Sequence, residues 1–484
     1  MVARRFLDYV RRSTMQSLNL TPTPSRHREL RQNYLAFPET IAQSIANISP
    51  TLTPVLSIPL VVASAGNGTW LAYLIATLGL LLVGLNVASF AQRHASAGAL
   101  YDYIFEGLGQ SPGFLGGWAM LAAYLSTAMA LLVGFAIFAV QILNQFHIRI
   151  PYLPVEVVGL LIAATLAYKD IRVSSITALI MEFSSVLLIS ILSIILLVRH
   201  KTLWDSAQLS LAHVHPSGIA LGLVLGVFSF VGFESSTTLG QEAKNPHRSI
   251  PAAVIISVLI AGVFFTSMAY FEVLAFPGGI TSLSQSTAPL NAMAITYHLS
   301  GFSLLIDLGA MISLFSCALA SLNAGARILF AMGRNQHIHD WVGQTHTVNR
   351  TPHIAVVIAS GVTLVALIAL AGSKPLNAYG YFGTYATYGF LVAYMLVSIA
   401  SPVLDRRQNR PWVGSLLRST GAVIFLLIPI IGSVYPVPAY PYNILPYLFL
   451  GYLGIGFIWN RLVASGKPSL HLISQTSPKE IEPT

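Results

Sequence analysis

A cluster of polar side chains interrupts one long apolar segment, at Phe228–Ser236, which we call the second break. Its sequence, FSFVGFESS, contains a carboxylate (Glu234), three hydroxyl groups and a glycine (Gly232). An ionised carboxylate costs about 2.5–3.5 kcal/mol at the centre of a membrane helix. Backbone that leaves the helix at membrane depth persists only where it is buried in protein or lines water. The stretch therefore predicts an interrupted helix facing a substrate cavity; a polar patch satisfied by neighbouring helices is the alternative.

A similar interruption lies in the first apolar segment, at Ala46–Pro54, which we call the first break. Its sequence, ANISPTLTP, places Pro50 and Pro54 four positions apart among serine and threonine. Each proline removes a backbone donor and clashes with the carbonyl four residues earlier. A proline kink would explain this stretch in isolation. Interrupted segments at matching positions in two halves of a chain, however, are typical of a transporter's binding site. We therefore predict two broken helices that meet near mid-membrane.

The half-helices at such breaks indicate which groups they bind. Unpaired N–H groups and the positive end of a helix dipole suit a carboxylate, and free carbonyl groups suit an ammonium. We predict that N–H groups of residues 51–53 hold one charge of a small zwitterion and that carbonyls of residues 228–230 hold the other. Phe228, Phe230 and Phe233 either wall this site or pack as ordinary core.

The composition indicates an integral membrane protein. The 484 residues are 55% hydrophobic and 9% charged, whereas soluble domains carry about 25% charged residues. The net charge of +9 comes from short basic clusters between apolar runs, a pattern of membrane topology rather than of a nucleic-acid partner. The single cysteine, Cys317, excludes a disulfide framework. No cofactor or metal site is predicted, because His337 and His339 lie in a basic loop where we expect solvent to satisfy them.

Twelve apolar runs have about the length of a bilayer crossing, which takes roughly 20 residues. They are 37–64, 70–91, 113–146, 155–168, 173–198, 217–243, 250–274, 303–332, 354–371, 378–404, 413–434 and 442–462. A short helix on a loop is predicted at 288–299. The predicted fold class is an all-α polytopic membrane protein with about 12 transmembrane helices.

The two breaks divide the chain into repeated units. Residues 37–198 form a first five-helix unit and residues 217–404 a second, each opening with a broken helix. Because five is an odd number of crossings, the second unit enters the membrane upside down, which predicts an inverted repeat. Residues 413–462 add two helices. Residues 1–36 are predicted to be a basic cytoplasmic tail and residues 465–484 a flexible one.

Basic residues predict the orientation. With the N-terminus in the cytoplasm, only four of the 26 lysines and arginines fall in outer loops, namely Arg149, Arg199, Lys201 and Lys374. Lysine and arginine are enriched in cytoplasmic loops. We therefore predict a multi-pass protein of the plasma (cell inner) membrane with both termini in the cytoplasm.

Three stretches resemble the amino acid–polyamine–organocation family of transporters, which has the LeuT-type fold. Residues 228–251 resemble its sixth-helix signature, a phenylalanine-rich break with GFE followed by a cytoplasmic E-x-x-N-P-x-R-x-x-P loop. Residues 321–334 are similar to the end of its eighth helix, and residues 170–174 to the loop that opens its fifth. The resemblance implies a secondary active transporter that moves an amino acid or related small amine by alternating access, as ion-coupled import. An amino acid or amine exchanger is the alternative.

Two other classes of protein fit the sequence less well. A receptor or sensor without transport would not require two matched broken helices. A membrane enzyme would require a catalytic motif, and the sequence contains no His-Glu-x-x-His, paired-Asp or Gly-x-Ser-x-Gly motif. We therefore expect that the chain is not an enzyme.

The resemblance also implies which side chains line the substrate site. At the first break they are Ala46, Asn47, Ser49, Thr51 and Leu52, and at the second they are Phe228, Ser229, Val231 and Gly232. Four candidates from other helices, for which a packing role is equally expected, are Tyr124, Thr127, Ser321 and Tyr385. Glu234 is implied as a gate or a structural acid. Many relatives have a glycine-rich first break where this chain has proline, threonine and leucine.

The fifth predicted span carries the candidates for ion coupling. In several relatives a lysine there carries the coupling proton or replaces a sodium ion, and by count it corresponds to Ser185. Glu182 lies three positions earlier and so shares that helix face about one turn away. We predict that Glu182 loads and releases a proton in each cycle; a structural acid is the alternative. Sodium held by hydroxyls of Ser49, Thr53 and Ser321 is a third possibility.

Overall fold

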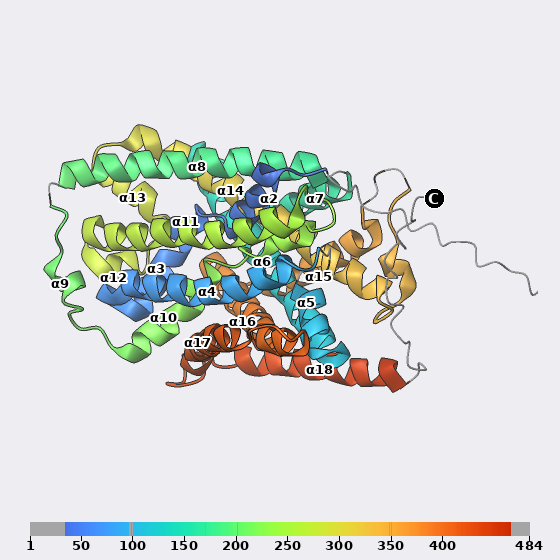
Figure 1. The fold of residues 1–484 in the computed structure, drawn as a ribbon. Coiled ribbons are helices and arrows are strands. Elements are labelled where there is room, and N and C mark those ends of the chain that lie inside the picture. Colours follow the sequence, from blue (N-terminus) through green and yellow to red (C-terminus); the bar gives the residue numbers. More distant parts are fainter. Residues whose placement is uncertain are drawn as a thin grey trace, which may run out of the picture.

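Long helices lie side by side in the structure, a computed structural model that describes residues 34–465 except 96, 97, 99, 170, 201, 348 and 350 (Figure 1). Within this part of the chain, β pairing is limited to one isolated bridge between Leu35 and Ala243. The predicted tails, 1–36 and 465–484, fall almost entirely outside the described residues.

Each predicted span coincides with a helix or with the pieces of a broken one. In order they are α2 (Phe37–Ile48) with η1 (Thr53–Ser57) and α3 (Ile58–Ala65), α4 (Thr69–Ala91), α6 (Gln110–Gln145), α7 (Tyr152–Lys169), α8 (Ile171–His200), α10 (Pro216–Phe228) with η3 (Ser235–Leu239), α11 (Pro246–Ala275), α14 (Ser300–Arg334), α15 (His353–Leu370), α16 (Pro375–Arg407), α17 (Val413–Gly432) and α18 (Leu445–Ser465). The predicted loop helix is α13 (Pro289–Thr296). Short helices not predicted are η2 (Gly66–Gly68), α5 (Leu100–Leu108), α9 (Ser206–Leu209), α12 (Gly279–Leu283) and η4 (Asp340–Gly343).

The membrane class of the fold is confirmed by the lengths and composition of these helices. Among the described residues, nine helical stretches are long and apolar enough to cross a membrane. One of them, Phe37–Ala91, contains the first two predicted spans, and α10 is a shorter apolar helix. Helices that are apolar on all sides are buried in a large core or in lipid.

Both predicted breaks are present. α2 ends at Ile48, and Ser49 takes a left-handed conformation with φ 48° before the chain resumes as the π-helical turn η1. The first interruption is therefore a break and not a proline kink. α10 ends at Phe228, Gly232 has φ 101°, and the chain continues only as the 3-10 turn η3. The prediction of one span continuing to residue 243 was wrong here, because α-helix does not resume until α11.

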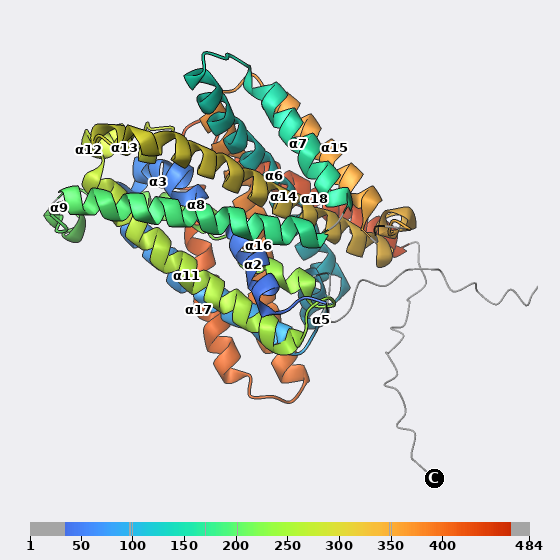
Figure 2. The same ribbon diagram turned by 90° about the horizontal axis from the view of Figure 1, so that it is seen from above.

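The broken helices lie inside the bundle. α2 packs against α11, α8 and α14, and α10 packs against α3, α4, α17 and α16. The view from above shows α2 between α8 and α11 (Figure 2). The long helix α6 packs mainly on α14 and α16. Close approach there depends on a small residue, since a Cβ on Gly389 of α16 would collide with the Ala119 carbonyl of α6.

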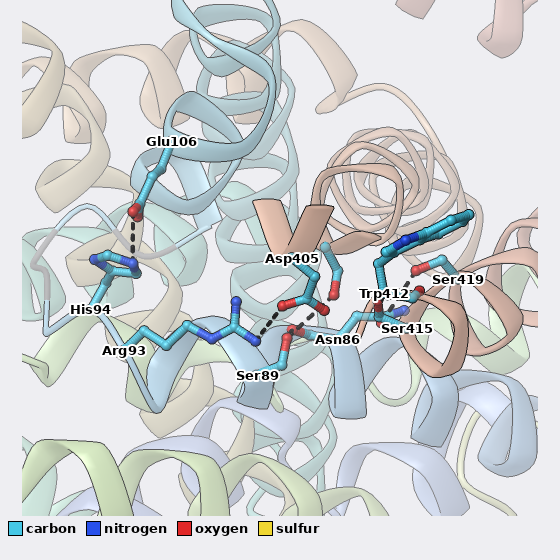
Figure 3. Close-up of polar contacts among 10 residues, drawn as sticks. Asn86, Ser89, Arg93, His94, Glu106, Asp405, Trp412, Ser415 and Ser419 are labelled. Carbon is cyan, nitrogen blue, oxygen red and sulfur yellow. Dashed lines mark hydrogen bonds and ion pairs between the residues drawn. The ribbon is translucent and has the colours of Figure 1, made fainter. Parts of the chain in front are cut away.

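Polar contacts join the helices at the end of the bundle where α4 and α16 finish. Arg93, just beyond α4, forms an ion pair with Asp405 of α16 at 2.6 Å, and His94 lies 2.7 Å from Glu106 of α5 (Figure 3). His337, also in a loop, is buried against Phe114. The prediction that solvent satisfies this histidine was therefore wrong, because α6 packs over it.

Candidate functional site

The two breaks contact each other directly. The hydroxyl of Ser44, two residues before the first break, donates to the carbonyl of Phe233 at 2.7 Å. A Cβ on Gly232 would lie 2.5 Å from Nδ2 and 2.8 Å from the carbonyl carbon of Asn47. Only glycine permits this approach, because its φ of 101° is strained for any other residue. The fold therefore places Asn47 and Gly232, both predicted site residues, in direct contact.

Glu182 of α8 binds the first break. Its Oε1 accepts hydrogen bonds from the Thr51 N–H at 2.9 Å and from the Thr51 hydroxyl at 3.0 Å. Its Oε2 accepts from the hydroxyls of Ser49, at 3.5 Å, and Ser313. The N–H group of Thr51, which we predicted would hold a substrate carboxylate, is thus bound to a carboxylate of the protein itself. The first N–H groups of a half-helix have no acceptor within that helix. The Glu182 carboxylate supplies an acceptor for one of them, the N–H of Thr51.

A polar stripe on α14 completes this side of the site. Ser313, Cys317 and Ser321 follow one another at four-residue spacing, which places them on one helix face. Ser313 lies 2.8 Å from the Ser49 hydroxyl, Cys317 donates to the Asn47 carbonyl at 2.9 Å, and Ser321 donates to Asn47 Oδ1 at 3.0 Å. Ser321 was expected at the site. The other two were missed, although the S-x-x-x-C-x-x-x-S spacing was visible in the sequence.

Glu234 holds the second break to two other helices. Its Oε1 accepts from the Tyr124 hydroxyl of α6 at 2.6 Å, and its Oε2 accepts from the Tyr394 hydroxyl of α16 at 2.7 Å. All three side chains are fully buried. The ring of Phe390, one turn before Tyr394, packs edge-on against Tyr124 at 5.1 Å. Tyr124 therefore binds Glu234 rather than facing open space, and Tyr394 is a partner that the sequence analysis missed.

Aromatic side chains surround the rest of the second break. The Ser229 hydroxyl lies 3.2 Å from that of Tyr73 on α4. The Phe228 ring packs against Tyr379 of α16, whose hydroxyl lies 3.2 Å from that of Ser57. Ala46, Leu52 and Val231 are buried at the two breaks. Neither Tyr73 nor Tyr379 was predicted.

Three predicted residues do not reach the breaks through any hydrogen bond in the described structure. The Thr127 hydroxyl bonds to Ala123 O within its own helix. Ser185 packs against Gly309 of α14, and its hydroxyl has no partner among the described residues. Tyr385 packs on Phe449 of α18 and lines a separate cavity of about 970 Å³ between α6, α15, α16 and α18. Tyr385 thus lies on another face of α16 than Tyr379 and Tyr394, and its contact with a substrate stays a prediction.

We expect the protein to lose stability when either tyrosine hydroxyl that donates to Glu234 is removed. Tyr124→Phe or Tyr394→Phe leaves one oxygen of a buried carboxylate without its hydroxyl donor, which costs about 1–3 kcal/mol. The thermal unfolding midpoint of the purified protein in detergent should therefore fall in both variants. Tyr385→Phe is the matched control on α16 and should leave the midpoint unchanged. An equal drop in the control would show that Glu234 does not depend on these two hydroxyls.

Known proteins resemble this chain in sequence and in fold. A family model described as amino acid permease matches residues 40–464. The branched-chain amino acid permease BcaP of Bacillus subtilis is 24% identical over 366 residues, covering 71% of this chain and 75% of that protein. The low-affinity putrescine importer PlaP of Escherichia coli is 24% identical over 367 residues, covering 72% and 77%.

A solved structure shares the fold. The crystal structure of the Eremococcus coleocola manganese transporter, in complex with an aromatic bis-isothiourea substituted compound, matches with a TM-score of 0.57 at 12% identity. The match covers 88% of this chain and 95% of that one. The family match confirms the resemblance found in the second break and its flanking loop, and the family is one of transporters rather than of enzymes. The chain belongs to the amino acid permease family.

Proposed function

We propose that the chain is a secondary active transporter that imports an amino acid or a related small amine by alternating access at its two breaks. The contact between Asn47 and Gly232 carries this proposal, because it joins two interrupted helices deep in an apolar bundle. Free backbone groups and hydroxyls at such a junction are the groups that bind small polar solutes. Two of the relatives, a branched-chain amino acid permease and a putrescine importer, support the same range of substrates.

The proposal includes the inverted repeat. Residues 37–198 and 217–404 are the two units, each opening with its broken helix, and residues 413–462 are the additional pair. In this arrangement the protein lies in the plasma membrane with both termini in the cytoplasm. The first turn of α2 and the last turn of α18 lie toward the same end of the bundle, which supports this topology (Figure 1).

Glu182 is the proposed site of ion coupling. Its carboxylate and the hydroxyls of Ser49 and Ser313 form a group of oxygen atoms that suits a proton or a sodium ion. The first break, α8 and α14 meet there; the first two belong to the first proposed unit and α14 to the second. Binding or release of a cation at Glu182 would therefore change how the first break is held against α8 and α14.

Uptake into proteoliposomes tests the proposed function. Purified protein should take up radiolabelled leucine, arginine or putrescine, and an inward proton or sodium gradient should raise the accumulation of at least one of them. Glu182→Gln should still exchange the substrate across the membrane but should lose gradient-driven accumulation. The absence of uptake and exchange for all three probes would contradict the proposal. Full accumulation by the variant would exclude Glu182 as the coupling site.

Cysteine labelling checks the topology. In a Cys317→Ser background, which keeps a hydrogen-bond donor to Asn47, a cysteine at Thr287 should react with a membrane-impermeant maleimide from outside intact cells. A cysteine at Gln408 should react only after permeabilisation. Both positions are exposed in the structure. The reverse pattern would invert the topology.

A further inference from the structure

Glu272 is a buried acid that none of the interactions described above uses. It lies in the last turn of α11, and its side chain is fully buried. Neither carboxyl oxygen has a hydrogen-bond partner among the described residues. By contrast, Glu182 and Glu234 accept bonds from hydroxyl groups, and Glu242 is paired with Arg327. Glu272 therefore has no protein group that would stabilise its ionised form.

Among the described residues, the charged and titratable groups near the outer end of α11 bond to other partners. α11 packs against α4, α2, α8, α12, α3, η1 and η3. On the outer half of these elements, Tyr73 bonds to Ser229, Arg199 to the Tyr297 carbonyl, His200 to Thr202, and Tyr270 of α11 itself to the Leu203 carbonyl. Of the remaining acids, Glu182 is held by the first break, and Glu39 lies in the first turn of α2, at the opposite end of the bundle.

Glu272 lies on the face of α11 that packs toward the second break. Phe265 lies seven residues earlier on α11, on the same face, and packs against Phe230 of the second break at 5.0 Å and against Tyr73 at 6.0 Å. Beyond Glu272, α11 ends at Ala275, and α12 follows after a short link in which Gly278 has φ 84°. α12 packs against both α11 and α3, and both views place it by this end of α11 (Figures 1 and 2).

We propose that Glu272 binds a proton from the outer side and that this binding permits the outer end of the bundle to close. The proposal rests on the proposed function, which assigns this end of α11 to the outside. Burying an ionised carboxylate that has no donor or cation beside it is strongly unfavourable. The closed arrangement therefore holds a neutral carboxylic acid at Glu272. When α12 moves away from α11, water reaches the carboxyl, the O–H bond breaks, and the proton passes to the outer solvent.

The test measures substrate counterflow at equal pH on both sides of proteoliposome membranes, with leucine and putrescine as probes. In the wild type, counterflow should fall as the pH rises, by up to about tenfold per pH unit once ionisation opposes closure. Glu272→Gln keeps the shape of the protonated acid and should keep counterflow at low pH while losing this alkaline decline. Glu156→Gln is the matched control, because Glu156 of α7 is also buried and no hydrogen bond of the described residues joins it to either break. It should show the wild-type profile.

The outcomes are distinct. The same alkaline decline in Glu272→Gln as in the wild type would overturn the proposal, as would a wild type without a decline. Loss of counterflow at every pH in Glu272→Gln would also overturn it, because the residue would then serve packing alone. A wild type without counterflow of any probe would contradict the proposed function instead.

Discussion

Replacement of Arg327 by methionine is expected to open the inner side of the protein and to abolish gradient-driven accumulation of substrate. Arg327 of α14 donates to Glu242 Oε2 at 3.0 Å and to the Thr238 carbonyl at 3.2 Å. Thr238 lies in η3, and Glu242 lies between η3 and α11. The Glu242 carbonyl also accepts from the N–H groups of Tyr34 and Leu35. Arg327 and Glu242 thus tie α14, the segment that follows the second break and the entry to α2 together.

The size of the effect follows from the burial of this pair. The side chains of Arg327 and Glu242 are only 9% and 7% exposed. Removing one partner of a buried pair leaves an unpaired charge and costs about 3–5 kcal/mol. A conformation that exposes Glu242 to water avoids this cost, so the population should move toward an inward-open state. Glu242→Gln should have the same effect in the same direction.

A second ion pair provides the control. Arg93 and Asp405 also join helices, at the end of the bundle that we propose faces the cytoplasm (Figure 3). No hydrogen bond of the described residues links either of them to a break. Arg93→Met should lower the thermal unfolding midpoint and leave accumulation measurable. The measurement is proteoliposome accumulation of the transported probe, normalised to the protein incorporated. Equal losses in Arg327→Met and Arg93→Met would show that the Arg327 pair contributes general stability only.

Substitution of Gly232 is expected to have a similarly large effect. Gly232→Ala adds a Cβ that would lie 2.5 Å from Asn47 Nδ2 and 2.8 Å from the Asn47 carbonyl carbon, and the second of these is backbone that no rotamer change can move. The φ of 101° adds strain of about 1–3 kcal/mol for a residue other than glycine. Because the two breaks can no longer meet, uptake should fall by roughly tenfold to hundredfold at equal protein level.

A glycine six residues earlier provides the matched comparison. A Cβ on Gly226 of α10 would meet nothing within 4 Å, so Gly226→Ala should retain uptake. Radiolabelled uptake by the two alanine variants, with the amount of folded protein measured by size-exclusion fluorescence, compares them directly. Equal uptake by Gly232→Ala and Gly226→Ala would show that transport does not depend on the contact between the two breaks.

The positions of the breaks could be predicted because their signals are local. Pro50 and Gly232 disturb the helix at their own positions, so the sequence shows where the backbone must leave the helix. The partners of Glu182 could not be predicted, since Thr51 and Ser313 each lie 131 residues away in the chain. We expected the Thr51 N–H to bind substrate, and nothing local indicates that a side chain from α8 occupies it.

The orientation of Tyr385 could not be predicted for a different reason. α16 contains apolar or aromatic residues on every side, so its sequence does not indicate which face points toward the breaks. Packing against α6 decides the rotation, and it places Tyr394 and Tyr379 inward and Tyr385 toward α18.

The native cysteine provides the most direct measurement of the central claim, that substrate binds where the two breaks meet. Cys317 is the only cysteine in the chain, and its Sγ lies 2.9 Å from the Asn47 carbonyl. Alkylation of Cys317 by a small maleimide in the purified wild-type protein, followed by mass spectrometry, reports access to this place. We predict that whichever of leucine, arginine and putrescine is transported slows the alkylation at saturating concentration, whereas a probe that is not transported leaves the rate unchanged. An alkylation rate that is the same with and without a transported probe would contradict the account.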